Sequence, residues 1–224
     1  MRITVIHGEN IPQIEIRYKE LILEYKKKDF VIDKFNQEIK KTLPEFISGV
    51  GLFEDKKLYV IENYSELTPI ELDKTIKQVG QSQDLLFVFN KKIGKTILDK
   101  FPSISRIEEK KLSENIFMFL DTLYPGNSEN SILLLHRLVE NGNPPEFVLA
   151  LMARHLKDIY LLKIHELNGK ESWKIAKLSK PARMFSEKQI KQLISDLADV
   201  DIKSKRSEGD LVDLLDHIIA VNLE

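Results

Sequence analysis

The strand signals in this sequence stop about halfway along the chain, and this change constrains the fold more than any other feature. Up to about residue 110, short apolar segments alternate with charged helical stretches. KLYVIE at Lys57–Glu62 is apolar and β-branched almost throughout, which is typical of a parallel strand buried on both faces. Strands that alternate with helices predict a parallel sheet flanked by helices. The other strands are expected at Ile3–His7, Phe30–Asp33, Leu85–Asn90 and Ser103–Ile107.

Helices are expected between these strands. The charged segment Glu15–Lys28 is the first, and a second helical stretch ends near Ile47. A third begins at Thr68-Pro69-Ile70-Glu71, where Thr68 can cap the N-terminus, Pro69 suits the first turn and Glu71 can complete a capping box.

The second half of the chain is predicted to be all helical. Apolar residues recur there at helical spacing, as in Ile132–Glu140 and Phe147–Lys163. Ser186 opens a further helix with a capping box, and a last helix starts at Ser207–Asp210. Five or so amphipathic helices in sequence predict a compact bundle. The fold class is therefore α/β followed by all-α, with domains at residues 1–107 and 108–224.

The composition narrows the function classes. The 224 residues carry 34 Lys plus Arg against 35 Asp plus Glu, so the basic bias of a protein that grips DNA by itself is missing. The absence of cysteine excludes a thiol nucleophile, a disulfide scaffold and a cysteine zinc site. The N-terminus has no signal-peptide pattern and no stretch is apolar enough for a membrane span, so a soluble, cytoplasmic protein is expected.

A phosphate-binding loop is the strongest enzymatic candidate, and it is incomplete. Gly94-Lys95-Thr96 matches the tail of a Walker A motif, but the position that needs the first glycine is Phe89. The loop after the first strand, His7–Asn10, has one glycine and no Lys-Ser/Thr pair. A degenerate P-loop NTPase stays as an alternative, although nothing in the sequence demands an enzyme.

Metal and cofactor chemistry are not indicated either. The five histidines are scattered without ligand spacing, and each is expected to be a surface or packing residue: His7, His136, His155, His165 and His217. Lysine clusters such as Lys26–Lys28 are diluted by nearby acids and indicate a solvated surface more than a nucleic-acid site. No cofactor and no metal are expected.

The remaining unusual segment is Ser48-Gly49-Val50-Gly51-Leu52-Phe53-Glu54-Asp55. Its two glycines place a turn directly before a bulky apolar pair, and charged residues follow. Most apolar pairs of this kind are buried, so Leu52 and Phe53 could anchor the loop in the core. The alternative is an exposed pair that fills a pocket on a partner protein.

Three segments carry a resemblance to a known family. GVGLFEDKKLYVIENY resembles the segment of DNA polymerase III delta subunits in which a Leu-Phe motif precedes a strand. LLLHRLVENGNPPEFVLALMARHLKDIYLLK is similar to a later helix-turn-helix of that family, with its Ala-Arg pair at Ala153 and Arg154. ARMFSEKQIKQLISDLADVDIKSK resembles the family's Arg-x-Phe-Ser segment and its later Asp and Lys, here Asp201 and Lys205.

This resemblance implies an AAA+-like sheet without a working P-loop, followed by a helical collar. It implies that Leu52 and Phe53 insert into a pocket of the β sliding clamp, with Ser48, Val50 and Gly51 in support. The expected partners are the clamp, the gamma/tau-type ATPase and delta-prime subunits of the clamp loader, and primer-template DNA within the assembly; no membrane is involved. The subunit would bind and open the clamp, or hold it open, without hydrolysing ATP.

The chain also departs from the family. The last expected strand runs almost directly into the collar-like helices, so the small helical lid domain that the family carries at this point is expected to be missing. An unrelated two-domain interaction scaffold, with Leu52 and Phe53 in its core, is the remaining alternative.

Overall fold

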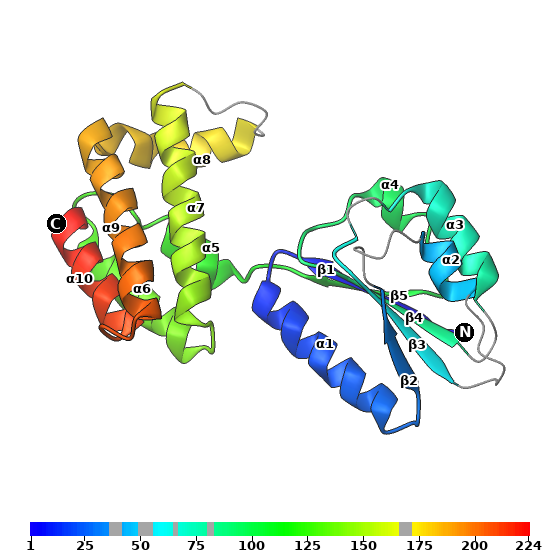
Figure 1. The fold of residues 1–224 in the computed structure, drawn as a ribbon. Helices are drawn as coiled ribbons and strands as arrows, with labels where there is room; N and C mark the ends of the chain where they lie inside the picture. The colour runs from blue at the N-terminus through cyan, green and yellow to red at the C-terminus, as the bar shows by residue number, and fades with distance from the viewer. Residues whose placement is uncertain (36–41, 49–55, 65–66, 80–82, 166–171) are drawn as a thin grey trace. The chain divides into compact units, whose positions relative to one another are not determined.

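The chain divides into two compact units, Met1–Leu112 and Ser113–Glu224 (Figure 1). The structure, a computed structural model, describes residues 1–35, 42–48, 56–64, 67–79, 83–165 and 172–224. The division follows Leu112, whereas the sequence pattern placed the boundary after residue 107. The predicted fold class is confirmed: a parallel sheet flanked by helices precedes a helical second half.

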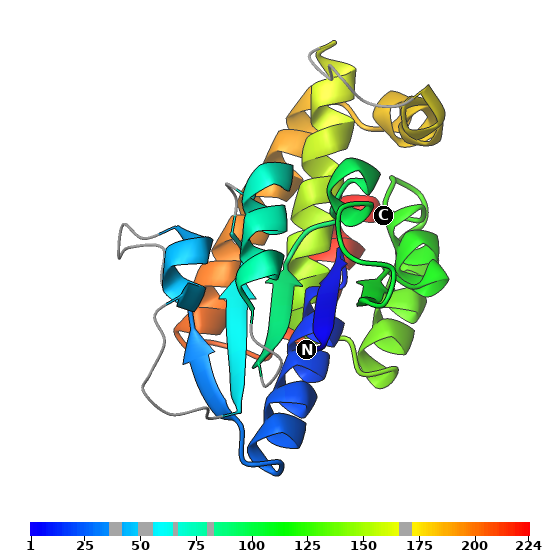
Figure 2. The same ribbon diagram turned by 90° about the vertical axis from the view of Figure 1, so that its right-hand side faces the viewer.

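The first unit is built on a five-stranded parallel sheet. Its spatial order is β2-β3-β4-β1-β5, and Figure 2 shows β2 at one edge beside β3 and β4. The strands are β1 (Ile3–Gly8), β2 (Val31–Lys34), β3 (Lys57–Glu62), β4 (Gln83–Phe89) and β5 (Arg106–Lys110). The three central strands β1, β3 and β4 are almost completely buried, as their apolar runs predicted.

Helices cover the two faces of this sheet (Figure 1). On one face, α1 (Ile11–Lys26) packs through Ile14 and Leu21 against alternate residues of the strands, such as Leu58 and Leu86. On the other face lie α2 (Leu43–Ser48), α3 (Pro69–Gln78) and α4 (Lys95–Leu98). Two apolar cores therefore sit on opposite sides of one sheet.

Two element boundaries differ from the sequence-based prediction. The first helix begins at Ile11 rather than at Glu15, because the Asn10 side chain caps it by accepting a hydrogen bond from the Gln13 N–H at 3.3 Å. The last strand is β5, Arg106–Lys110, rather than Ser103–Ile107. As an edge strand that pairs only with β1, β5 carries charged residues, so an apolar pattern could not locate it.

The described part of the second unit is helical. It contains α5 (Glu114–Leu120), α6 (Ser128–Glu140), α7 (Pro145–Lys163), α8 (Ser172–Met184), α9 (Glu187–Lys205) and α10 (Leu211–Leu223). Helix α7 packs against α8 and α9, while α10 packs against α6 and α9. Only three residues separate the end of β5 from the start of α5, so no lid domain lies at this point. None of the helices in the described ranges combines the length and apolar character needed to cross a bilayer.

Helix α8 was missed by the sequence pattern. Its stretch mixes lysines and serines with apolar residues, and Pro181 lies inside it, which argues locally against a helix. Packing against α7 stabilises it nevertheless, through buried residues such as Leu178 and Ala182. The capping box predicted at Ser186 is confirmed, with both reciprocal hydrogen bonds present.

Candidate functional site

The predicted clamp-binding residues are only partly described by the structure. Ser48 is the last residue of α2. Val50, Gly51, Leu52 and Phe53 fall in residues 49–55, outside the described ranges. Their role in clamp binding therefore stays a prediction, and the structure informs it through the elements that hold the two ends of this segment.

Helix α2, which leads into the segment, is fixed on the core by its apolar face. Leu43 and Ile47 are buried, with 0% and 1% of their surface exposed. The ring of Phe46 makes edge-to-face contacts with Tyr59 of β3 and with Phe35, at centroid distances of 5.4 and 5.3 Å. A six-residue helix is unstable by itself, so these contacts are what hold α2 in place.

Polar contacts tie both ends of the segment to the sheet. The buried Tyr59 hydroxyl donates a hydrogen bond to the Ile47 carbonyl oxygen at 3.4 Å, next to the point where α2 ends. Burial, followed by the nearby Asp33 carboxylate, raises the pKa of Tyr59, so this hydroxyl stays a donor. At the other end, the Lys56 carbonyl accepts a hydrogen bond from the Val31 N–H at 2.8 Å. Residues 49–55 thus run between two anchored points.

Glu71 of α3 fixes the start of α2. Its Oε1 accepts hydrogen bonds from the Leu43 N–H at 3.2 Å and the Tyr64 hydroxyl at 2.9 Å. Thr68 caps α3 as predicted, by accepting from the Glu71 N–H at 3.1 Å. The Glu71 side chain, however, serves α2 rather than a capping box, because the exposed N-terminus of α2 offers unpaired N–H donors.

The loop after β1 lies where open parallel sheets usually bind phosphates, and it is filled by the protein's own hydrogen bonds. Strands β1 and β4 are neighbours whose connections leave on opposite faces, which makes this the switch point of the sheet. The Gly8 N–H donates to the Lys91 carbonyl, and the N–H groups of Glu9 and Asn10 both donate to the Lys110 carbonyl, all at 3.1 Å.

The start of α1 offers little more to an anion. The Gln13 N–H is taken by the Asn10 cap, and Pro12 has no N–H to offer. The second phosphate-binding candidate, Gly94-Lys95-Thr96, forms the beginning of the four-residue helix α4. There the Gly94 carbonyl accepts hydrogen bonds from Ile97 and Leu98, so the segment forms a short turn rather than a loop wrapped around a ligand.

The histidines act as packing and pairing residues where the structure describes contacts for them. Buried His7 accepts the Ile93 N–H at its Nδ1, at 3.2 Å, and burial lowers its pKa. His136 of α6 pairs with Asp216 of α10 at 2.7 Å, a contact across 80 residues that sequence spacing could not reveal. The described residues contain no cluster of His, Asp and Glu side chains fit to hold a metal ion.

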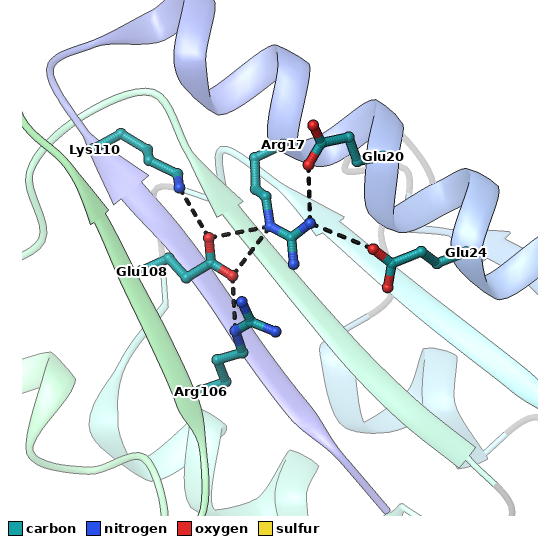
Figure 3. Close-up of polar contacts among 6 residues, drawn as sticks. All are labelled: Arg17, Glu20, Glu24, Arg106, Glu108 and Lys110. Carbon is teal, nitrogen blue, oxygen red and sulfur yellow. Dashed lines mark hydrogen bonds and ion pairs between the residues drawn. The ribbon is translucent and has the colours of Figure 1, made fainter.

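An ion-pair network joins α1 to the edge strand β5 (Figure 3). The Arg17 guanidinium lies 3.2 Å from the Glu108 carboxylate, and both side chains are largely buried. Glu108 also pairs with Arg106 and Lys110, each at 2.9 Å. Burial alone would raise the pKa of Glu108, but the hydrogen bonds from Lys110 and Arg17 outweigh it and hold that pKa below its usual value. The network closes the β5 side of the unit, and no local pattern predicted it.

The second unit carries the recognisable family signature. Residues 113–220 match the model of the DNA polymerase III delta subunit, C-terminal domain, which is nearly the whole of that unit. Among solved structures, the Bacillus subtilis DNA clamp loader delta protein (YqeN) is similar over 100% of this chain and 95% of that chain, with 13% identity and a TM-score of 0.46. A comparison with curated protein sequences finds no match. The resemblance predicted from the sequence is thus supported where the C-terminal match lies: through its second unit, the chain belongs to the DNA polymerase III delta-subunit family.

Proposed function

We propose that this chain is a non-ATPase delta-type subunit of a clamp loader, which binds the β sliding clamp through Leu52 and Phe53 and opens it or holds it open. The family match over residues 113–220 carries the proposal. It makes an unrelated interaction scaffold the weaker alternative. In this proposal the protein acts in the cytoplasm, assembled with gamma/tau-type ATPase and delta-prime subunits around primer-template DNA.

The anchoring of the segment before and after Leu52 and Phe53 supports the binding half of the proposal. A loop that presents an apolar pair to a partner loses less entropy on binding when its ends are already fixed. Here one end follows the buried Ile47 and the other enters the sheet at Lys56. Ser48, Val50 and Gly51 would support the apolar pair.

The closed switch point supports the non-ATPase half. A nucleotide triphosphate needs several backbone N–H groups directed at its phosphates. In this protein Gly8, Glu9 and Asn10 donate theirs to backbone carbonyls instead. A degenerate NTPase would have to break these hydrogen bonds to bind its ligand.

Clamp binding is tested by measuring the affinity of the full chain for its cognate sliding clamp by biolayer interferometry. Removing two pocket-filling side chains in Leu52→Ala/Phe53→Ala should weaken binding by at least about 100-fold, since each is worth roughly 1.5–3 kcal/mol. Ile70→Ala/Ile104→Ala is the matched control, because these side chains are 70% and 84% exposed in the same unit. Equal affinity of the Leu52/Phe53 variant and wild type would refute the assignment.

The ATPase alternative has its own test. Titration of the full chain with a fluorescent ATP analogue and Mg²⁺ is expected to show no saturable binding up to millimolar concentrations. Stoichiometric binding that Gly8→Ala abolishes would favour a degenerate NTPase, whatever the outcome with the clamp.

A further inference from the structure

A groove runs between α1 and the edge strand β2, on the sheet face opposite α2. Its volume is about 680 Å³. The floor is formed by Tyr18, Ile22 and Leu23 of α1 and by Ile32 of β2. Leu23 is 58% exposed, which is unusual for a large aliphatic side chain beside further apolar surface.

The rim of this groove is positively charged. Lys19 and Lys26 of α1 stand on one side, and Lys34 of β2 stands on the other. Lys34 is paired with Glu62 at 3.0 Å and lies over the Tyr18 ring. Within the part of the chain that the structure describes, neither Lys19 nor Lys26 has an ion-pair partner.

The opposite flank of α1 differs sharply. The acids Glu20 and Glu24 gather there around Arg17, on the side that faces β5 (Figure 3). Helix α1 therefore separates its charges: the acids are consumed in the Arg17 network, whereas the flank toward β2 presents lysines around an apolar floor. Such an arrangement is complementary to a ligand that is both acidic and apolar.

Strand β2 adds backbone groups to this surface. The N–H groups of Val31 and Phe35 donate to β3, at 2.8 and 2.9 Å. Because the direction of these groups alternates along a strand, the N–H groups of Ile32 and Lys34 point away from the sheet. An extended segment beside β2 could accept hydrogen bonds from them, as in recognition by strand addition.

We propose that the groove between α1 and β2 binds an extended peptide segment of a partner protein in which apolar residues alternate with Asp or Glu. Its apolar side chains would cover Leu23 and Ile32, and its carboxylates would meet Lys19 and Lys26. Strand geometry fits this division, since alternate side chains of an extended segment point to opposite sides. The proposal does not depend on clamp binding, because α2 lies on the other face of the sheet.

The test uses fluorescence anisotropy of the full chain with a fluorescein-labelled synthetic peptide in which Leu alternates with Asp. Wild type should bind it saturably, with an affinity that falls as salt rises. Lys19→Glu/Lys26→Glu should weaken binding by about tenfold or more, and Leu23→Ser should weaken it at constant charge. Both changes affect exposed side chains, so folding should be preserved.

Lys95→Glu/Lys100→Glu is the matched control, with the same charge change at exposed lysines near α4 on the other face of the sheet. This control should bind the peptide like wild type. Equal weakening in the control would reduce the effect to net charge and overturn the proposal. So would full binding of a peptide with Ser in place of Leu, or a groove that mediates self-association or binds anionic vesicles without binding the peptide. Clamp affinity should be the same in Lys19→Glu/Lys26→Glu as in wild type, which separates this proposal from the proposed function.

Discussion

Replacing Gly8 with alanine should destabilise the first unit severely. Gly8 ends β1 with φ at +146°, a backbone conformation that side chains with a Cβ rarely adopt. An added Cβ would also overlap the Lys110 carbonyl group, whose carbon would lie only 2.7 Å away. This carbonyl cannot move freely, because it accepts hydrogen bonds from the N–H groups of both Glu9 and Asn10.

The magnitude follows from these two effects. The backbone strain costs about 1–3 kcal/mol, and forcing extra atoms into a packed site costs a further 1–3 kcal/mol. A loss of about 3 kcal/mol or more is therefore expected. At this level, amide hydrogens of β1 and β4 should exchange about 100-fold faster than in wild type.

Hydrogen exchange measured by mass spectrometry on the full chain resolves the effect by segment. Peptides from α9, in the second unit, should keep their protection and serve as an internal reference. Gly94→Ala is the control substitution: its φ is −68° and a Cβ there would meet nothing within 4 Å, so the expected loss is below about 1 kcal/mol. Exchange in β1 of Gly8→Ala within about fivefold of wild type would refute the reasoning.

Three further predictions concern single side chains. Thr75→Val should stabilise the first unit by about 1 kcal/mol in urea unfolding, because the fully buried hydroxyl has no hydrogen-bond partner; a loss of stability would contradict this. Glu108→Gln should weaken the coupling between α1 and β5 at neutral pH. Because the pKa of Glu108 is lowered in the folded state, the wild-type stabilisation should be present at neutral pH and decline as pH falls below about 4.5 through that pKa, whereas the variant should lack this part of the acid sensitivity in unfolding curves measured from pH 7 to pH 3. Ser186→Ala should cost about 1 kcal/mol by removing the cap of α9, with Ser186→Asp retaining most of the stability in thermal melts.

The sequence by itself determined the fold class and most of the helices and central strands. These features depend on residues within about one turn or one strand of each other, as in the apolar run Lys57–Glu62 and the capping box at Ser186. It also carried the family resemblance in the C-terminal unit. Its errors fell where tertiary packing overrides local preference, at the Pro-containing helix α8 and the charged edge strand β5.

Only the tertiary structure decided which distant groups meet. Gly8 lies against Lys110, the Glu71 carboxylate serves α2 and Arg17 pairs with Glu108 because strand order brings together segments far apart in the chain. Local patterns carry no information on such pairings, since every register and strand order buries the same apolar residues. The predicted loop without an ATP site thus gained its physical reason from the fold: the N–H groups at the switch point are already used by the backbone.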